Sequence, residues 1–268
     1  MKTNIATNSI LLFVALTIGY GFFKSLLIFM QPSETIGDNF FIKNFEYVAL
    51  GLYIFTTFGI QLITNISSAK KICKDSSQKI TNVLLYTLFP YVIIFVSIIC
   101  FINIFPGWLR PFSNTFGYAF AMFLSVKSVF TELLKTQGDN PLLGQIYSDK
   151  SMIINEMSPD NYDDFMANLK GSGILKQNVK DLSEYVDLKN IIKIKNIVAE
   201  VIWYILAGVL SITVSNSIIM NYKCEYDIAT MKKMHKELDD KEAELQKKAN
   251  ENTQTTSTGV TTIPTATD

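Results

Sequence analysis

Residues 83–105 read VLLYTLFPYVIIFVSIICFINIF, an apolar run without one charged side chain. An α-helix rises about 1.5 Å per residue, so about 20 such residues cross the hydrocarbon core of a bilayer. Pro90 lies inside the run and removes one backbone hydrogen bond, which predicts a kink; neighbouring helices can satisfy the freed carbonyl. The stretch therefore predicts a transmembrane helix and sets the fold class, an all-α integral membrane protein.

Three further runs have the length and composition of membrane-spanning helices, at residues 10–30, 47–66 and 197–220. The first follows Lys2 as a signal peptide would, but it is too long and lacks an A-x-A cleavage site, so we expect a retained helix. The last carries small side chains every four residues, a pattern that favours close helix packing. These small residues are Ala207, Ser211 and Ser215.

Residues 116–130 leave the number of crossings open. The run is apolar apart from Lys127, but about fifteen residues are marginal for a full crossing. The segment either crosses the membrane or is re-entrant. Residues 1–130 then contain four membrane segments, and the whole chain has four or five transmembrane or re-entrant helices. A lysine-rich joint at 67–81 predicts a cytoplasmic location for that joint and for the amino terminus. If the segment crosses, residues 131–196 are cytoplasmic and the carboxyl-terminal tail lies on the other side of the membrane. If it is re-entrant, the tail is cytoplasmic and residues 131–196 lie on the other side.

Residues 131–196 form the one sizeable non-membrane region before the tail. Ser158 and Pro159 are a typical helix start, with Ser158 as N-cap. An apolar stripe follows and is stopped by the glycines of 171–173. The stripe consists of Tyr162, Phe165, Met166 and Leu169. About 65 residues are few for an independent core, so we expect a small helical cap packed on the membrane helices.

The carboxyl end divides into a charged helix at 221–250 and a Thr-rich segment at 251–268 that is expected to be disordered. Apolar and other side chains recur in the helix at alternating steps of four and three residues, as in a coiled coil. They are Cys224, Ile228, Met231, His235, Leu238, Glu242 and Leu245. The polar His235 and Glu242 weaken this seam, so either weak self-association or a single exposed helix fits.

Composition argues against several function classes. The 24 basic and 24 acidic residues balance, whereas a nucleic-acid-binding protein usually shows a basic excess. The chain has one histidine and three widely separated cysteines, which predicts no metal site and no disulfide framework. It contains neither a Walker loop nor a GxGxxG motif. We therefore expect no catalytic residue and no cofactor, and a protein that is not an enzyme.

Residues 106–118, PGWLRPFSNTFGY, are the most distinctive joint of the chain. Two prolines argue against a continuous helix through the stretch, and tryptophan and tyrosine favour the membrane–water boundary. We expect a structured hairpin at the interface. Its candidate interaction residues are Trp108, Arg110, Phe112 and Asn114, and a hairpin folded onto its own helices is the alternative.

The same stretch resembles a motif in multi-pass membrane proteins of nucleocytoplasmic large DNA viruses of algae and protists. Residues 140–143, NPLL, and the acidic helix after Ser158 are similar too, so the resemblance covers roughly residues 45–220. It implies a structural protein of the virion's internal lipid membrane, also present in host-derived membranes. It supplies no catalytic residues.

These observations predict a scaffold or anchor that sits in the lipid bilayer and offers its cap and charged helix to capsid or core proteins. A small channel or transporter is the alternative, since Pro90 and the 106–118 stretch resemble the broken helices of such proteins. Isolated charges are costly at membrane depth, which suggests that Glu200 pairs with Lys127. Separate snorkelling of the two side chains to the interface is the other interpretation.

Overall fold

The computed structural model describes residues 3–30, 40–73, 80–135, 141–221 and 228–257. Within these ranges every regular element is helical, and β pairing is limited to an isolated antiparallel bridge between Leu134 and Leu175. The sequence-based expectation of an all-α fold is confirmed.

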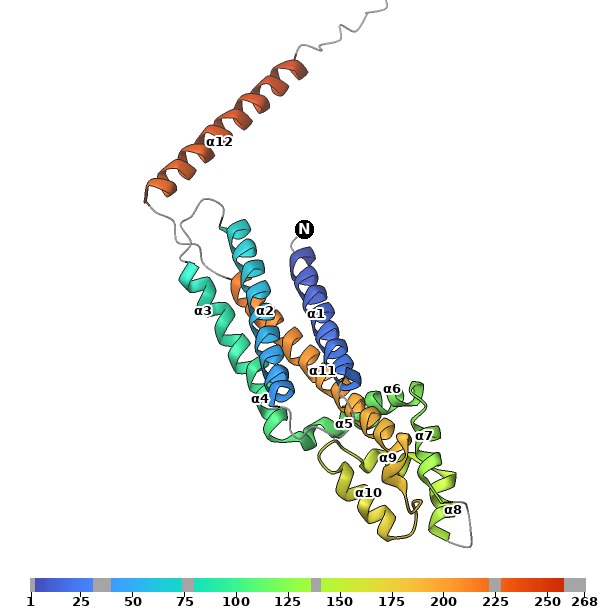
Figure 1. Cartoon of the computed structure of the whole chain (residues 1–268). Helices are drawn as coiled ribbons and strands as arrows, with labels where there is room; N and C mark the ends of the chain where they lie inside the picture. The colour runs from blue at the N-terminus through green and yellow to red at the C-terminus, as the bar shows by residue number, and fades with distance from the viewer. Residues whose placement is uncertain (1–2, 31–39, 74–79, 136–140, 222–227, 258–268) are drawn as a thin grey trace, which may run out of the picture.

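Within the described ranges, four helical segments are long and apolar enough to cross a membrane. They are α1 (Thr3–Met30), α2 (Phe40–Ile72), the composite of α3 (Ile80–Pro90), η1 (Tyr91–Val96) and α4 (Ser97–Ile104), and α11 (Ser183–Met220). They pack side by side with alternating direction, so that α1 and α3–α4 run one way and α2 and α11 the other (Figure 1). The chain is therefore an all-α membrane protein by length and composition of its helices.

Pro90 interrupts the third span without ending it. The helix continues through one π-helical turn, η1, before α4 resumes the α-helical pattern. Wider turns of this kind absorb a residue that cannot donate its backbone hydrogen bond. At Pro90, where the sequence predicted a kink, the structure has a local π-helical widening, and the span continues through it.

The segment from Pro106 to Leu133 stays at one end of the bundle (Figure 1). It consists of η2 (Pro106–Leu109), α5 (Arg110–Phe112), the π-turn η3 (Ser113–Gly117), α6 (Tyr118–Phe123) and α7 (Val126–Leu133). Ser125 takes the left-handed conformation (φ 58°) and breaks the helix between α6 and α7. Residues 116–130 are therefore not one helix and do not form a fifth candidate span.

The same segment crosses beneath α11 at a very close approach. A Cβ on Gly117 would lie 2.3 Å from the backbone oxygen of Lys195. Only glycine fits there, because any side chain would overlap the α11 backbone. This contact holds the 106–123 segment against α11 and keeps it at the end of the bundle.

Helices α7, α8 (Pro141–Ser148), α9 (Ser151–Glu156) and α10 (Tyr162–Gly171) build the cap together with the first turns of α11. The core of the cap includes Tyr185 and Leu188 of α11, so the domain boundary expected at residue 197 cuts through a continuous helix. Helix α10 begins at Tyr162, not after Ser158. The side chain of Asn161 accepts a hydrogen bond from the Ser158 amide, so residues 158–161 form a turn before the helix.

The charged helix α12 spans Ile228–Ser257, and the side chains described in it, between 231 and 249, are exposed. The helix runs past the expected start of disorder at residue 251; residues 258–268 lie outside the described ranges.

Cys73, which follows α2, is disulfide-bonded, so the expectation of no disulfide is wrong. Cys100 is a free thiol.

Candidate functional site

A pocket of about 410 Å³ lies where the bundle meets the cap. Its walls come from the adjoining ends of α1, α2 and α4, from η2, from the turn before α10, and from α11. Its charged lining residues are Lys24, Glu46, Asp160, Lys193 and Glu200. The volume falls in the range of small-molecule and cofactor sites, about 300–1,000 Å³.

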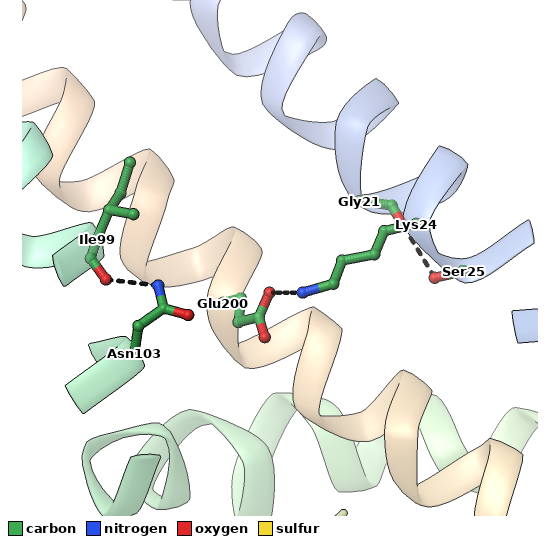
Figure 2. A network of polar contacts seen from close by, with 6 residues as sticks. All are labelled: Gly21, Lys24, Ser25, Ile99, Asn103 and Glu200. Atoms are coloured by element: carbon green, nitrogen blue, oxygen red, sulfur yellow. Dashed lines mark hydrogen bonds and ion pairs between the residues drawn. The ribbon is translucent and has the colours of Figure 1, made fainter. Parts of the chain in front are cut away.

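At the base of this pocket, Lys24 of α1 and Glu200 of α11 form an ion pair. The Lys24 ammonium donates to Glu200 Oε2 at 2.6 Å, and both side chains are mostly buried. Figure 2 shows the two side chains pointing toward one another across the space between the helices. A partner of opposite charge reduces the cost of holding each ion at membrane depth. The suggested pairing of Glu200 with Lys127 is wrong, because Glu200 pairs with Lys24, while Lys127 lies exposed on α7.

Asn103 of α4 lies beside this pair (Figure 2). Its amide nitrogen donates to the Ile99 carbonyl at 2.7 Å, which fixes the side chain on the pocket wall. The pocket lining contains three carboxylates and two ammonium groups, which leaves a net charge of one negative unit. A site of this composition can hold a molecule that carries both charges, with its cationic end favoured.

The four residues predicted as an interaction site lie next to the pocket and do not line it. Their segment contributes Pro106 and Leu109 to the wall instead. Arg110 is exposed and Asn114 is half-buried. Trp108 is 52% exposed, and its backbone oxygen accepts a hydrogen bond of 3.0 Å from the indole of Trp203.

Trp203 connects two of the predicted residues. Its ring lies 5.0 Å from that of Phe112 and 6.3 Å from that of Trp108, both edge-on. Sequence inspection missed Trp203 because it sits inside an apolar run, yet tryptophan in the first third of a span is typical of the interface. The cluster fixes the 106–112 segment against α11; an intermolecular role for it stays a prediction.

A second polar feature runs through the bundle on one face of α2. Four buried polar side chains recur there at helical spacing: Thr57, Gln61, Asn65 and Ser68. The Asn65 amide donates to Thr87 Oγ1 at 2.9 Å and to Ser215 Oγ at 2.6 Å, which ties α2 to α3 and α11. Such bonds between spans replace the water that lipid cannot offer.

Comparisons with known proteins add no assignment: no protein-family model, curated protein or solved structure matches the chain. Within the described ranges, no group of three or more His, Cys, Asp or Glu side chains could hold a metal ion. The candidate site is therefore defined by its own geometry, a charged pocket at the junction of bundle and cap.

Proposed function

We propose that the chain is a membrane scaffold that holds a folded cap at one end of its bundle and an exposed charged helix beyond the other. The observation that carries this proposal is the continuity of α11. Its 38 residues correspond to a length of roughly 57 Å, against about 30 Å of hydrocarbon core. Part of the helix belongs to the cap core and the rest to the bundle. One continuous helix therefore joins the cap to the bundle.

The interior of the bundle supports a static role. Four aromatic side chains, from α1, α2, η1 and α11, fill its centre: Phe13, Tyr53, Phe95 and Tyr204. The Phe95 ring lies 5.4 Å from that of Phe13 and 6.1 Å from that of Tyr53. Packed rings of this kind stabilise one arrangement of these helices.

The proposed partners bind the two protruding parts. The side chains described in α12 are exposed, including Leu238 (58%) and Leu245 (66%), as is Met152 (68%) in the cap. By the resemblance of the 106–118 stretch, we propose that the membrane is the internal membrane of a large DNA virus and the partners are capsid or core proteins. Weak self-association through the α12 seam is a further proposal of the same kind.

Site-specific photo-crosslinking in the native membrane tests the scaffold. A photoreactive residue is placed at Leu238 or Met152, and at the lipid-facing Phe55 as the matched control. The proposal expects discrete protein adducts from the first two positions and lipid adducts alone from Phe55. Lipid or solvent adducts alone from all three positions would exclude a scaffold with bound partners.

A small channel or transporter is the second candidate, and the polar face of α2 favours it. Buried polar side chains also line the paths that ions or solutes follow through membrane proteins. Purified protein in liposomes gives the test. Selective flux that disappears in Asn65→Leu would establish transport and displace the scaffold; no flux above empty liposomes would remove this second candidate.

A further inference from the structure

We propose that the charged pocket binds the headgroup of a phospholipid carrying a primary ammonium group, of the phosphatidylethanolamine class. The inference rests on the membrane location of the chain and not on its proposed partners. It assigns a ligand to a site that the scaffold role does not require.

The charge distribution of the pocket selects the headgroup. Glu200 is already paired with Lys24 at 2.6 Å. The remaining charged side chains of the lining are Glu46, Asp160 and Lys193, two carboxylates and one ammonium. This set matches a zwitterion whose ammonium approaches the carboxylates while its phosphate approaches Lys193. An anionic headgroup would add negative charge to a pocket that already has an excess of it.

The chemistry of the wall distinguishes a primary ammonium from a quaternary one. A primary ammonium donates three hydrogen bonds, and carboxylates and amide oxygens are the acceptors it needs. The pocket offers these on Glu46, Asp160, Asn103 and Asn196. Quaternary ammonium groups are recognised by aromatic cages instead. The described residues that line this pocket include no aromatic side chain, so choline is not the matching headgroup.

An apolar surface for the acyl chains begins next to the charged residues. Phe23 and Phe45, the sequence neighbours of Lys24 and Glu46, contact one another across α1 and α2 with ring centroids 6.1 Å apart. Phe23 is 40% and Phe45 48% exposed, and the exposed Leu26 and Phe29 continue the same kind of surface along α1. A ligand with a polar head and apolar tails therefore fits the junction better than a soluble zwitterion does.

Native mass spectrometry of the delipidated full-length protein tests the assignment. Phosphatidylethanolamine, phosphatidylcholine and phosphatidylglycerol with identical chains are titrated separately, and apparent Kd values are compared. We expect the ethanolamine lipid to bind about tenfold more tightly than the other two, the factor expected for one charge-assisted hydrogen bond. Equal binding of the ethanolamine and choline lipids overturns the proposal.

Three variants sharpen the test. Glu46→Gln should remove most of the preference for the ethanolamine lipid over the choline lipid. Lys193→Gln should weaken the binding of both lipids, because both carry the phosphate. Asp187→Asn removes an exposed carboxylate of α11 that does not line the pocket, so it should change neither the lipid preference nor the affinity. Helicity and thermal unfolding of each variant show that it is folded. An unchanged lipid preference in folded Glu46→Gln contradicts the assignment.

Soluble glycerophosphoethanolamine separates the two sources of the same headgroup. The lipid assignment expects it to compete only at concentrations about a hundredfold or more above the lipid, because it lacks the apolar chains. Competition at equal concentration would make the ligand a soluble zwitterion and overturn the lipid assignment. Neither result depends on the crosslinking experiment, so failure of the scaffold and failure of this inference are distinguishable.

Discussion

The cap and the bundle of this chain differ in how many polar side chains they bury. Among the described residues, the cap core consists almost entirely of apolar side chains. The buried Lys195 donates to the carbonyls of Ile154 and Met157 at 3.1 and 3.4 Å. The bundle buries a mixture of rings and polar groups and exposes large apolar side chains. The buried polar set includes Thr17, Thr57, Gln61, Asn65, Ser68, Thr87, Ser211 and Ser215.

The difference follows from the surrounding solvent. Water drives apolar side chains of the cap into a common core, at about 25 cal/mol per Å² removed from water. Lipid offers no such drive, so the spans associate through close packing and hydrogen bonds. Buried apolar area should therefore contribute most to the stability of the cap. Close packing and polar contacts between helices should contribute most to the stability of the bundle.

The largest contrast is expected between two phenylalanines. Phe130→Ala, in the cap, empties a site that is 0% exposed and should cost about 3–5 kcal/mol of stability. Phe55→Ala changes a ring that is 77% exposed on α2 and should cost less than about 1 kcal/mol of stability. The reason is that the ring contacts lipid in the folded and in the unfolded chain alike. Denaturant unfolding in detergent, with protease resistance of the cap, measures both. Equal costs would contradict the comparison.

The next effect concerns the junction between the two regions. Gly117→Ala places a methyl group 2.3 Å from the Lys195 carbonyl oxygen and should cost about 1–3 kcal/mol, because the 106–123 segment must move away from α11. The matched control is Gly107→Ala in the same segment, where a Cβ meets nothing within 4 Å. Thermal unfolding of the two variants compares them directly. A Tm of Gly117→Ala equal to that of Gly107→Ala would mean that the close approach is relaxed in the membrane.

The Lys24–Glu200 pair should be worth about 1–2 kcal/mol, between exposed and fully buried ion pairs. A double-mutant cycle with Lys24→Met and Glu200→Gln gives this coupling, because the double variant leaves no unpaired charge. Lys127→Met with Glu200→Gln is the control cycle and should be additive, since Lys127 is exposed on α7. Additivity in both cycles would contradict the pairing of Lys24 with Glu200.

A smaller effect is expected within the bundle. Asn65→Ala removes the hydrogen bonds to Thr87 and Ser215 and should cost about 1 kcal/mol, in line with polar contacts between spans. Thr64→Ala on the neighbouring face, where the hydroxyl donates to the Ile60 carbonyl of its own helix, should cost less. Steric-trap or denaturant unfolding in bicelles resolves the two values. A larger loss for Thr64→Ala would place the important contact elsewhere on α2.

The smallest effect is a pH dependence at the cap surface. Lys189 donates to Asp163 Oδ2 at 2.8 Å and Tyr185 to Oδ1 at 2.9 Å, and these contacts hold the pKa of the Asp163 carboxyl below its ordinary value. The stabilisation is complete above the unfolded pKa of about 3.9 and disappears as the pH falls through the lower folded value. Asp163 is largely exposed, so Asp163→Asn should cost less than about 1 kcal/mol at neutral pH.

The measurement is the stability of wild type and Asp163→Asn as the pH is lowered. The difference between them should be constant at neutral pH and vanish in acid below the folded pKa. A difference that persists unchanged in acid would assign the effect to packing and not to the carboxylate charge.

The sequence by itself determined the fold class and the approximate location of the four spans. Runs of about 20 apolar residues have few alternatives to a membrane helix, because each backbone polar group must be satisfied within the lipid. The apolar stripe of α10 and the small-residue stripe of α11 could also be predicted from the sequence, since both depend on spacing within one helix. Ala207, Ser211 and Ser215 are indeed buried.

Only the tertiary structure decided which distant residues meet. Glu200 pairs with Lys24, 176 positions away, because α1 and α11 lie side by side. The pocket likewise gathers residues from segments that no local pattern connects. Whether residues 116–130 cross was open because fifteen apolar residues are marginal by length alone. The break at Ser125 and the approach of Gly117 to α11 settle their path, and both are properties of packing, which acts between segments and leaves no periodic signal in either one.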